Sequence, residues 1–177
     1  NRIENTSIAL GVGGANARAY ADGDALVDND QGVVSVAGAS IYGERLNVSD
    51  NRVGLNASNA SRISVHQSEI ADNAEFGALV SDGNATIEAE SIWWGAASGP
   101  GGGVADPDTG TAADGTGDNV TRNVTCDPWL SGTPVAASGT VSRADEEPAS
   151  GTVVLVTRNG SDDAELDPEG RFAASVE

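Results

Sequence analysis

Apolar residues recur at a fixed interval through the first half of the chain. One apolar column, spaced by 22 residues, is Leu26, Val48, Ile70 and Ile92. A second, with two extra residues in its last step, is Ile41, Ile63 and Ile87. Repeats of this length are typical of solenoids, in which each unit packs only on its neighbours.

Polar residues keep the same interval and define the repeat unit. Each unit contains an Asp-Asn pair followed by a glycine. The members are Asp28, Asn29 and Gly32, then Asp50, Asn51 and Gly54, then Asp72, Asn73 and Gly77. We expect the asparagines to form a ladder of stacked amides at a turn. We expect the glycines to supply the positive φ of a tight corner.

The segments between these turns are short and alternate apolar with polar residues. Examples are residues 34–36, 62–66 and 85–89. Alternation with period 2 predicts strands, and no segment sustains the period of a helix. A leucine-rich repeat would need more leucine in each unit. The sequence therefore predicts an all-β fold, a parallel β-helix whose coils stack at about 4.8 Å.

The repeat and the segment after it resemble a known family. The unit I/V-x-D-N-x-x-G is similar to the right-handed parallel β-helix repeat of pectate-lyase-like extracellular proteins, over about Ala19 to Leu130. Downstream motifs follow the order of that family's terminal signature: Ile92-Trp93-Trp94-Gly95, Gly99-Pro100, Gly115-Thr116-Gly117-Asp118-Asn119-Val120, Asn123-Val124 and Pro128-Trp129-Leu130. Ile92 stands where the family usually has Asn, so we expect it to continue the Leu26 column.

The ends of the predicted solenoid are less regular. Residues 1–24 read as an irregular earlier coil, with a loop at residues 11–14. Residues 96–133 read as a capping segment, with one last strand from Asn119 to Pro128. The tryptophans, at positions 93, 94 and 129, favour a cover over the open end of the apolar column; a sugar-binding platform is the alternative.

A second module begins near residue 134, so the expected domains are 1–133 and 134–177. Apolar runs at 135–141 and 151–158 precede Asn159-Gly160, a strong hairpin-turn signal. With Asp167-Pro168-Glu169-Gly170-Arg171-Phe172, this order resembles the opening of a carboxypeptidase regulatory-like β-sandwich. Such a domain needs more strands than residues 134–177 supply, so we interpret the module as partial.

The charge of the chain indicates the environment in which the protein works. The net charge is −18, and all nine basic residues are arginine. A lysine-free, uniformly acidic surface resembles proteins of extreme halophiles, especially haloarchaea, because dense carboxylates stay hydrated where molar salt screens their repulsion. An ordinary acidic extracellular protein is the alternative. The acidity argues against nucleic acid as a partner.

Eight N-x-S/T sequons indicate a glycosylated protein at the cell surface or outside the cell, although asparagine-rich turns also generate this pattern incidentally. They are at Asn5, Asn47, Asn56, Asn59, Asn84, Asn119, Asn123 and Asn159. The sequence has no apolar run of membrane-spanning length, so no membrane insertion is expected.

The search for catalytic and ligand-binding residues assigns none: no catalytic, cofactor-binding or metal-binding residue, and no cofactor. His66 is the only histidine and is expected to point outward from a strand. Cys126 is the only cysteine and is expected to be buried. The Asp28, Asp50 and Asp72 column fits turn chemistry; cation binding by these stacked carboxylates stays open.

These observations favour an extracellular or cell-surface β-helix with a structural or adhesive role, with polysaccharide or surface glycan as candidate ligand. The alternative is a polysaccharide lyase or glycoside hydrolase of the pectate-lyase-like superfamily, with active coils partly outside this sequence. A spacer without a ligand is a third possibility. The repeated acids share similar environments, whereas acid–base catalysis needs two distinct groups, so the sequence leans against an enzyme.

Overall fold

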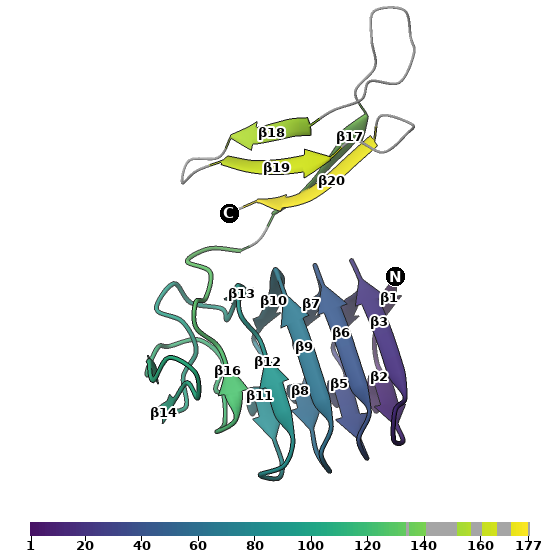
Figure 1. The fold of residues 1–177 in the computed structure, drawn as a ribbon, viewed down its shortest axis with the longest axis vertical. Coiled ribbons are helices and arrows are strands. Elements are labelled where there is room, and N and C mark those ends of the chain that lie inside the picture. Colours follow the sequence, from purple (N-terminus) through teal and green to yellow (C-terminus); the bar gives the residue numbers. More distant parts are fainter. Residues whose placement is uncertain (134, 141–151, 157–160, 166–170, 177) are drawn as a thin grey trace, which may run out of the picture. The chain divides into compact units, whose positions relative to one another are not determined.

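The protein is described from a computed structural model that covers residues 1–133, 135–140, 152–156, 161–165 and 171–176. The chain divides into two compact units, Asn1–Thr133 and Pro134–Glu177. The first unit is a solenoid of about four coils, in which successive coils add parallel strands to three sheets (Figure 1). No helix occurs among the described residues, which confirms the predicted all-β parallel solenoid.

Each complete coil contributes one strand to each sheet. The first sheet contains β1 (Arg2–Ile3), β4 (Ala25–Val27), β7 (Asn47–Ser49), β10 (Ser68–Ala71) and β13 (Ile92–Trp93). The second contains β2 (Ile8–Gly13), β5 (Gln31–Val36), β8 (Val53–Ala57) and β11 (Phe76–Val80). The third contains β3 (Arg18–Asp22), β6 (Ser40–Glu44), β9 (Arg62–His66), β12 (Thr86–Glu88) and β16 (Val124–Thr125).

The apolar columns form the core, with one correction to the predicted register. Leu26 pairs with Val48, and Val48 with Ile70, and all three side chains are buried. Ile92 pairs with Ser68 and not with Ile70. The same register pairs Glu69 with Trp93, so Trp94 is the residue that follows Ile70 in the apolar column. The extra residues in the fourth coil cause this shift. The column therefore ends on a fully buried indole, whose large area suits the end of a stack.

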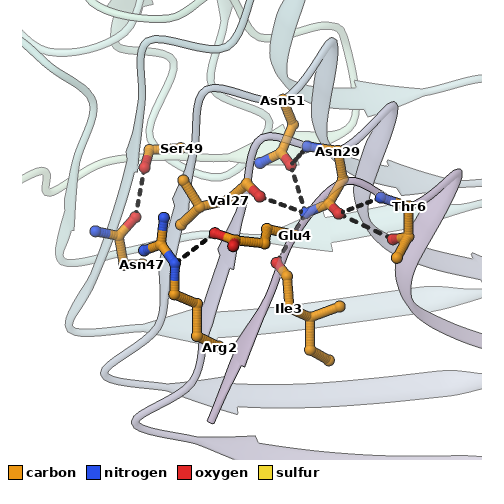
Figure 2. Close-up of polar contacts among 9 residues, drawn as sticks. All are labelled: Arg2, Ile3, Glu4, Thr6, Val27, Asn29, Asn47, Ser49 and Asn51. Carbon is orange, nitrogen blue, oxygen red and sulfur yellow. Dashed lines mark hydrogen bonds and ion pairs between the residues drawn. The ribbon is translucent and has the colours of Figure 1, made fainter.

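The predicted asparagine ladder is present at the corner between the first and second sheets (Figure 2). The Asn51 side-chain oxygen accepts hydrogen bonds from the backbone and side-chain nitrogens of Asn29, at 2.9 and 3.1 Å. Asn73 accepts the same pair from Asn51, both at 3.1 Å. The side-chain nitrogen of Asn51 also donates to the Leu26 carbonyl oxygen at 2.9 Å. These buried amides therefore satisfy one another and the coil backbone.

Two residues outside the repeat pattern complete the ladder. Thr6 donates its backbone N–H and hydroxyl to the Asn29 side-chain oxygen in the first coil. At the other end, an Asp118 carboxylate oxygen accepts from the backbone and side-chain nitrogens of Asn73, at 3.0 and 2.7 Å. The Asn ladder therefore consists of Thr6, Asn29, Asn51, Asn73 and Asp118, and its last member lies 45 residues after Asn73.

Because Asp118 is a carboxylate in a largely buried position, its contribution to the stability of the fold depends on pH. Burial raises the pKa of Asp118 to about 6, although its hydrogen bonds from Asn73 act in the opposite direction. Because this folded-state pKa lies above the ordinary value of 3.8, the ionised form costs stability in the folded protein. The contribution of Asp118 to the folding free energy is therefore most favourable below pH about 4 and is lost as the pH rises through 6.

Asp118→Asn keeps the acceptor oxygen and removes the buried charge. We expect this variant to gain about 1–2 kcal/mol at pH 7.5 and close to nothing at pH 4, measured by denaturant unfolding in constant salt. Asp114→Asn is the control, because it removes one charge from an exposed position in the same segment. An equal gain in both variants, or a gain at pH 4, would contradict the assignment to Asp118.

The corner chemistry differs from the expectation for glycine. Positive φ belongs to the aspartates, at 60° for Asp28, 56° for Asp50 and 59° for Asp72. Asp adopts this region more readily than most residues. The repeat glycines instead have no room for a side chain: a Cβ on Gly54 would lie 2.6 Å from the Gly77 carbonyl oxygen. The glycine prediction was therefore wrong: Gly32, Gly54 and Gly77 lie just after the corner, inside β5, β8 and β11, where tight packing selects them.

Both ends of the solenoid are more regular than expected. Residues 11–13 lie in β2 and pair with β5, so the predicted loop at 11–14 is wrong over most of its length. The predicted strand from Asn119 to Pro128 is broken by a corner at Asn123, whose φ is 64°. Val120 bridges to Ala78 in the second sheet, and β16 pairs with β12 in the third. A fifth, partial coil thus follows the excursion made by residues 95–119.

This excursion and the end of the partial coil close the core. The excursion contains the antiparallel pair β14 (Val104–Ala105) and β15 (Ala112–Ala113). Trp129 packs against the core and lies over Gly99, where a Cβ would meet the indole at 2.3 Å. Together with buried Trp94, these contacts support the capping interpretation of the tryptophans over the sugar platform.

In the second unit, the described residues form two antiparallel pairs. Strand β17 (Val135–Thr140) pairs with β20 (Arg171–Val176), and β18 (Thr152–Val156) pairs with β19 (Ser161–Glu165). The β18–β19 pairing agrees with a hairpin, whereas the predicted Asn159-Gly160 turn itself lies outside the described residues.

Candidate ligand-binding face

The outward side of the third sheet presents the most distinctive surface of the solenoid. Its side chains alternate in direction: Ile41, Ile63 and Val65 point inward and are fully buried, whereas Tyr42 and His66 are partly exposed, Glu44 is exposed and Ser64 is covered by its neighbours. The tyrosine face consists of six outward side chains from β3, β6 and β9: Tyr20, Asp22, Tyr42, Glu44, Ser64 and His66.

Two tyrosines form its centre. Tyr20 pairs with Tyr42 in the strand register, and their rings stack with centroids 5.3 Å apart and planes inclined by 16°. Tyr20 retains 75% of its surface exposed. The inward neighbours of Tyr20, Ala19 and Ala21, are partly buried against the core, so the backbone directs this ring to the solvent. An aromatic ring that is fixed by stacking and open to water is a ready platform for a ligand with an apolar face.

Polar groups surround this platform within a shallow groove of about 420 Å³. Asp22 and Glu44 are neighbours across β3 and β6, and both are exposed. The Arg45 guanidinium lies 2.5 Å from the Asp22 carboxylate and 3.5 Å from that of Glu44. The groove therefore combines an aromatic surface with several hydrogen-bond acceptors, the composition expected of a binding site for a polar ring.

His66 points outward as predicted and belongs to the same groove. Its Nε2 atom lies 3.0 Å from the Ser64 hydroxyl oxygen. This pair resembles part of a nucleophilic site, but the histidine has no carboxylate hydrogen-bonded to its other ring nitrogen among the described contacts. Asp22 and Glu44 share one exposed environment and one arginine partner, whereas acid–base catalysis needs groups in contrasting environments.

The aspartate column lies elsewhere, at the corner beside the Asn ladder. Asp28, Asp50 and Asp72 are all exposed there, next to the buried asparagines. Their positive φ explains the choice of Asp by backbone conformation alone. Across the described residues, no group of three or more His, Cys, Asp or Glu side chains is arranged to hold a metal ion.

Asp106, an acidic residue in the excursion, has a structural role. Its two carboxylate oxygens accept backbone hydrogen bonds from Asp108, Thr109, Cys126 and Asp127. Burial opposes ionisation of this group, but the four donors outweigh it and lower the pKa to about 2. Asp106 thus fastens the excursion to the last coil.

Cys126, the neighbour of Asp106 in this arrangement, is buried as predicted, with 1% of its surface exposed. Burial, assisted by the Asp106 charge, raises the pKa of the thiol to about 12. Because the thiolate is the reactive form, this cysteine is chemically inert and packs as a small apolar residue.

Comparison with known proteins found no relative of this chain. No protein-family model matches the chain, and neither the curated proteins nor the solved structures contain a match. Among the described residues, no helix is both long and apolar enough to cross a membrane.

Sequence reasoning had assigned no site residue, and it missed the tyrosine pair. The signal was present, because Tyr20 and Tyr42 lie 22 residues apart, in step with the repeat. The repeat was expected to reach back to Ala19, but two aromatic residues are too short a series to mark a site. The regular β3–β6 pairing fixes both rings on the outer side of the sheet.

Proposed function

We propose that this chain is part of an exported, cell-surface β-helix protein that binds carbohydrate through the tyrosine face without cleaving it. The observation that supports the proposal best is the stacked, solvent-open Tyr20–Tyr42 pair beside hydrogen-bond acceptors. A pyranose ring has an apolar face that packs on an aromatic ring, and its hydroxyls donate to carboxylates such as Asp22 and Glu44.

Charge restricts the class of sugar. The groove contains two carboxylates, and the whole chain has a net charge of −18. A uronic-acid polymer bound in the groove would bring its carboxylates into contact with Asp22 and Glu44, a range at which molar salt screens repulsion least, whereas neutral or amino sugars bring no like charge. The proposed ligands are therefore neutral or amino-sugar glycans, in the high-salt, haloarchaeal setting that the lysine-free composition favours.

We also propose an identity for the second unit, residues 134–177. The antiparallel pairs β17–β20 and β18–β19 are compatible with the opening strands of a carboxypeptidase regulatory-like β-sandwich.

Tyr20→Ala is expected to weaken glycan binding by about tenfold or more, because it removes the exposed stacking ring. Binding would be measured by calorimetry in molar KCl, with chitin and mannan oligosaccharides beside polygalacturonate. Ile8→Ala is the matched control, since Ile8 is an exposed apolar residue, with 44% of its surface accessible, on a different sheet.

Three outcomes would count against this function. Equal binding by the Tyr20→Ala and unaltered proteins would remove the tyrosine face from the interaction. Absence of binding to every polymer would favour the inert spacer. New reducing ends or unsaturated products would favour the lyase or hydrolase alternative.

A further inference from the structure

The structure separates the sequons by whether a glycan could be attached to the folded protein. An acceptor needs a free Asn side-chain nitrogen and an accessible hydroxyl two residues later. Of the eight sequons, the one at Asn159 lies outside the described residues. The other seven have different surroundings, and most of them are occupied by structural hydrogen bonds.

Three acceptor side chains already serve the fold. The Asn56 side-chain nitrogen donates to the Gln31 side-chain oxygen at 2.7 Å, while the Asn56 oxygen accepts from Ser81 at 2.9 Å. Asn123 donates its side-chain nitrogen to the Gly83 carbonyl oxygen at 3.3 Å. Asn47 lies partly buried in β7 and accepts from its own sequon hydroxyl, that of Ser49, at 2.6 Å. A glycan at Asn56 or Asn123 would displace a contact between coils, and at Asn47 the sequon hydroxyl is already engaged.

Two further sequons have an exposed asparagine but an engaged hydroxyl. The Ser61 hydroxyl of the Asn59 sequon is buried and donates to the Ser35 carbonyl oxygen at 2.6 Å. The Thr121 hydroxyl of the Asn119 sequon accepts from the Val80 backbone N–H at 2.8 Å. In the folded protein, neither hydroxyl is available to an enzyme that reads the sequon.

The remaining two sequons are open at both positions. Asn84 lies at the corner between β11 and β12, and both Asn84 and Thr86 are exposed. Asn5 lies between β1 and β2, and Asn5 and Ser7 are likewise exposed. None of these four side chains forms a hydrogen bond within the part of the chain that the structure describes. We propose that Asn5 and Asn84 are the N-glycan acceptors of the folded solenoid.

This proposal rests on the proposed export of the protein to a compartment that supplies a lipid-linked sugar donor. In the transfer, the Asn side-chain nitrogen forms a bond to the anomeric carbon of the donor sugar. The bond from that carbon to the donor phosphate oxygen breaks, the amide loses one proton, and the lipid phosphate leaves. The Asn84 corner lies on the fourth coil and Tyr20 on the first, a separation of three coils or about 14 Å, so a glycan there leaves the tyrosine face open.

The test is glycopeptide mass spectrometry on the full chain, secreted with an added signal sequence by a host that performs N-glycosylation. Only secreted, folded protein is analysed, so native export is not part of the readout. We expect glycans at Asn5 and Asn84. Thr86→Ala should abolish the Asn84 glycan, Thr86→Ser should retain it, and Ser7→Ala should abolish the Asn5 glycan.

Ser58→Ala is the control, because it destroys the Asn56 sequon and should leave the glycan pattern unchanged. Secreted protein without glycans at Asn5 and Asn84, or with glycans at Asn47, Asn56, Asn59, Asn119 or Asn123, would overturn the proposal. Glycan binding by the tyrosine face is measured separately on unglycosylated protein, so each proposal can fail while the other stands.

Discussion

Asn51→Asp is expected to destabilise the solenoid by about 3–5 kcal/mol, although the two side chains have nearly the same shape. Asn51 is 1% exposed, and its side-chain nitrogen donates to the Leu26 carbonyl oxygen and to the Asn73 side-chain oxygen. A carboxylate at this position would bring a buried charge against two acceptors and leave both without a donor. A loss of this size is a large part of the total stability of an ordinary domain.

The measurement is denaturant unfolding followed by circular dichroism at pH 7.5. Asn16→Asp is the matched control, because Asn16 is an exposed corner residue with φ of 68°, where Asp is also tolerated. The control should change the unfolding free energy by less than about 0.5 kcal/mol. Similar losses in both variants would show that added charge, and not the ladder, limits stability.

The folded state itself is expected to depend on molar salt. Residues 1–133 contain 18 acidic residues and six arginines. Arg52 forms ion pairs with both Asp30 and Glu75. Because the acids outnumber the arginines by this margin, most of the negative charge remains uncompensated even where one arginine pairs with two acids. At 1 M salt the Debye length is about 3 Å and repulsion between coils is screened, whereas at 0.01 M it is about 30 Å.

Circular dichroism and thermal unfolding should therefore show cooperative β structure in 2 M KCl that weakens or disappears in dilute buffer. The triple variant Asp28→Asn, Asp50→Asn and Asp72→Asn should fold at lower salt, because it removes three exposed charges from one corner while retaining residues that tolerate positive φ. Full stability in dilute buffer would reject the halophilic interpretation. Rescue by millimolar CaCl₂ alone would instead indicate a cation site at this column.

The repeat made the interior of the fold predictable from sequence. Stacking places residues such as Asn29, Asn51 and Asn73 in equivalent environments, so the same requirement selects the same residue each time. The apolar columns follow for the same reason. The cause of the glycine column was mistaken, because a short side chain and a positive φ leave the same trace in a sequence, and only the 2.6 Å approach at Gly54 distinguishes them.

The features that the sequence did not predict either lie outside the repeat or recur too few times to form a column. Asp118 joins the ladder from an excursion with no periodicity, so nothing in the sequence linked it to Asn73. Extra residues in the fourth coil moved Trp94 into the apolar column in place of Ile92. The tyrosine face was missed because its two rings occur in only two coils, and a pair is too short a series to separate a site from coincidence.

Asn51 and Asn73, the inner members of the ladder, make equivalent contacts, and this equivalence allows the solenoid to change in length. Asn51 accepts from the coil before it and donates to the coil after it through the same atoms that Asn73 uses. An in-frame duplication of one 22-residue unit would therefore insert a coil that fits on both sides, lengthening the molecule by about 4.8 Å. The contacts that Thr6 and Asp118 make with the ladder would be kept, and the tyrosine face would be unaltered. Growth and shortening of this solenoid can thus proceed by whole 22-residue units inserted or removed between these features.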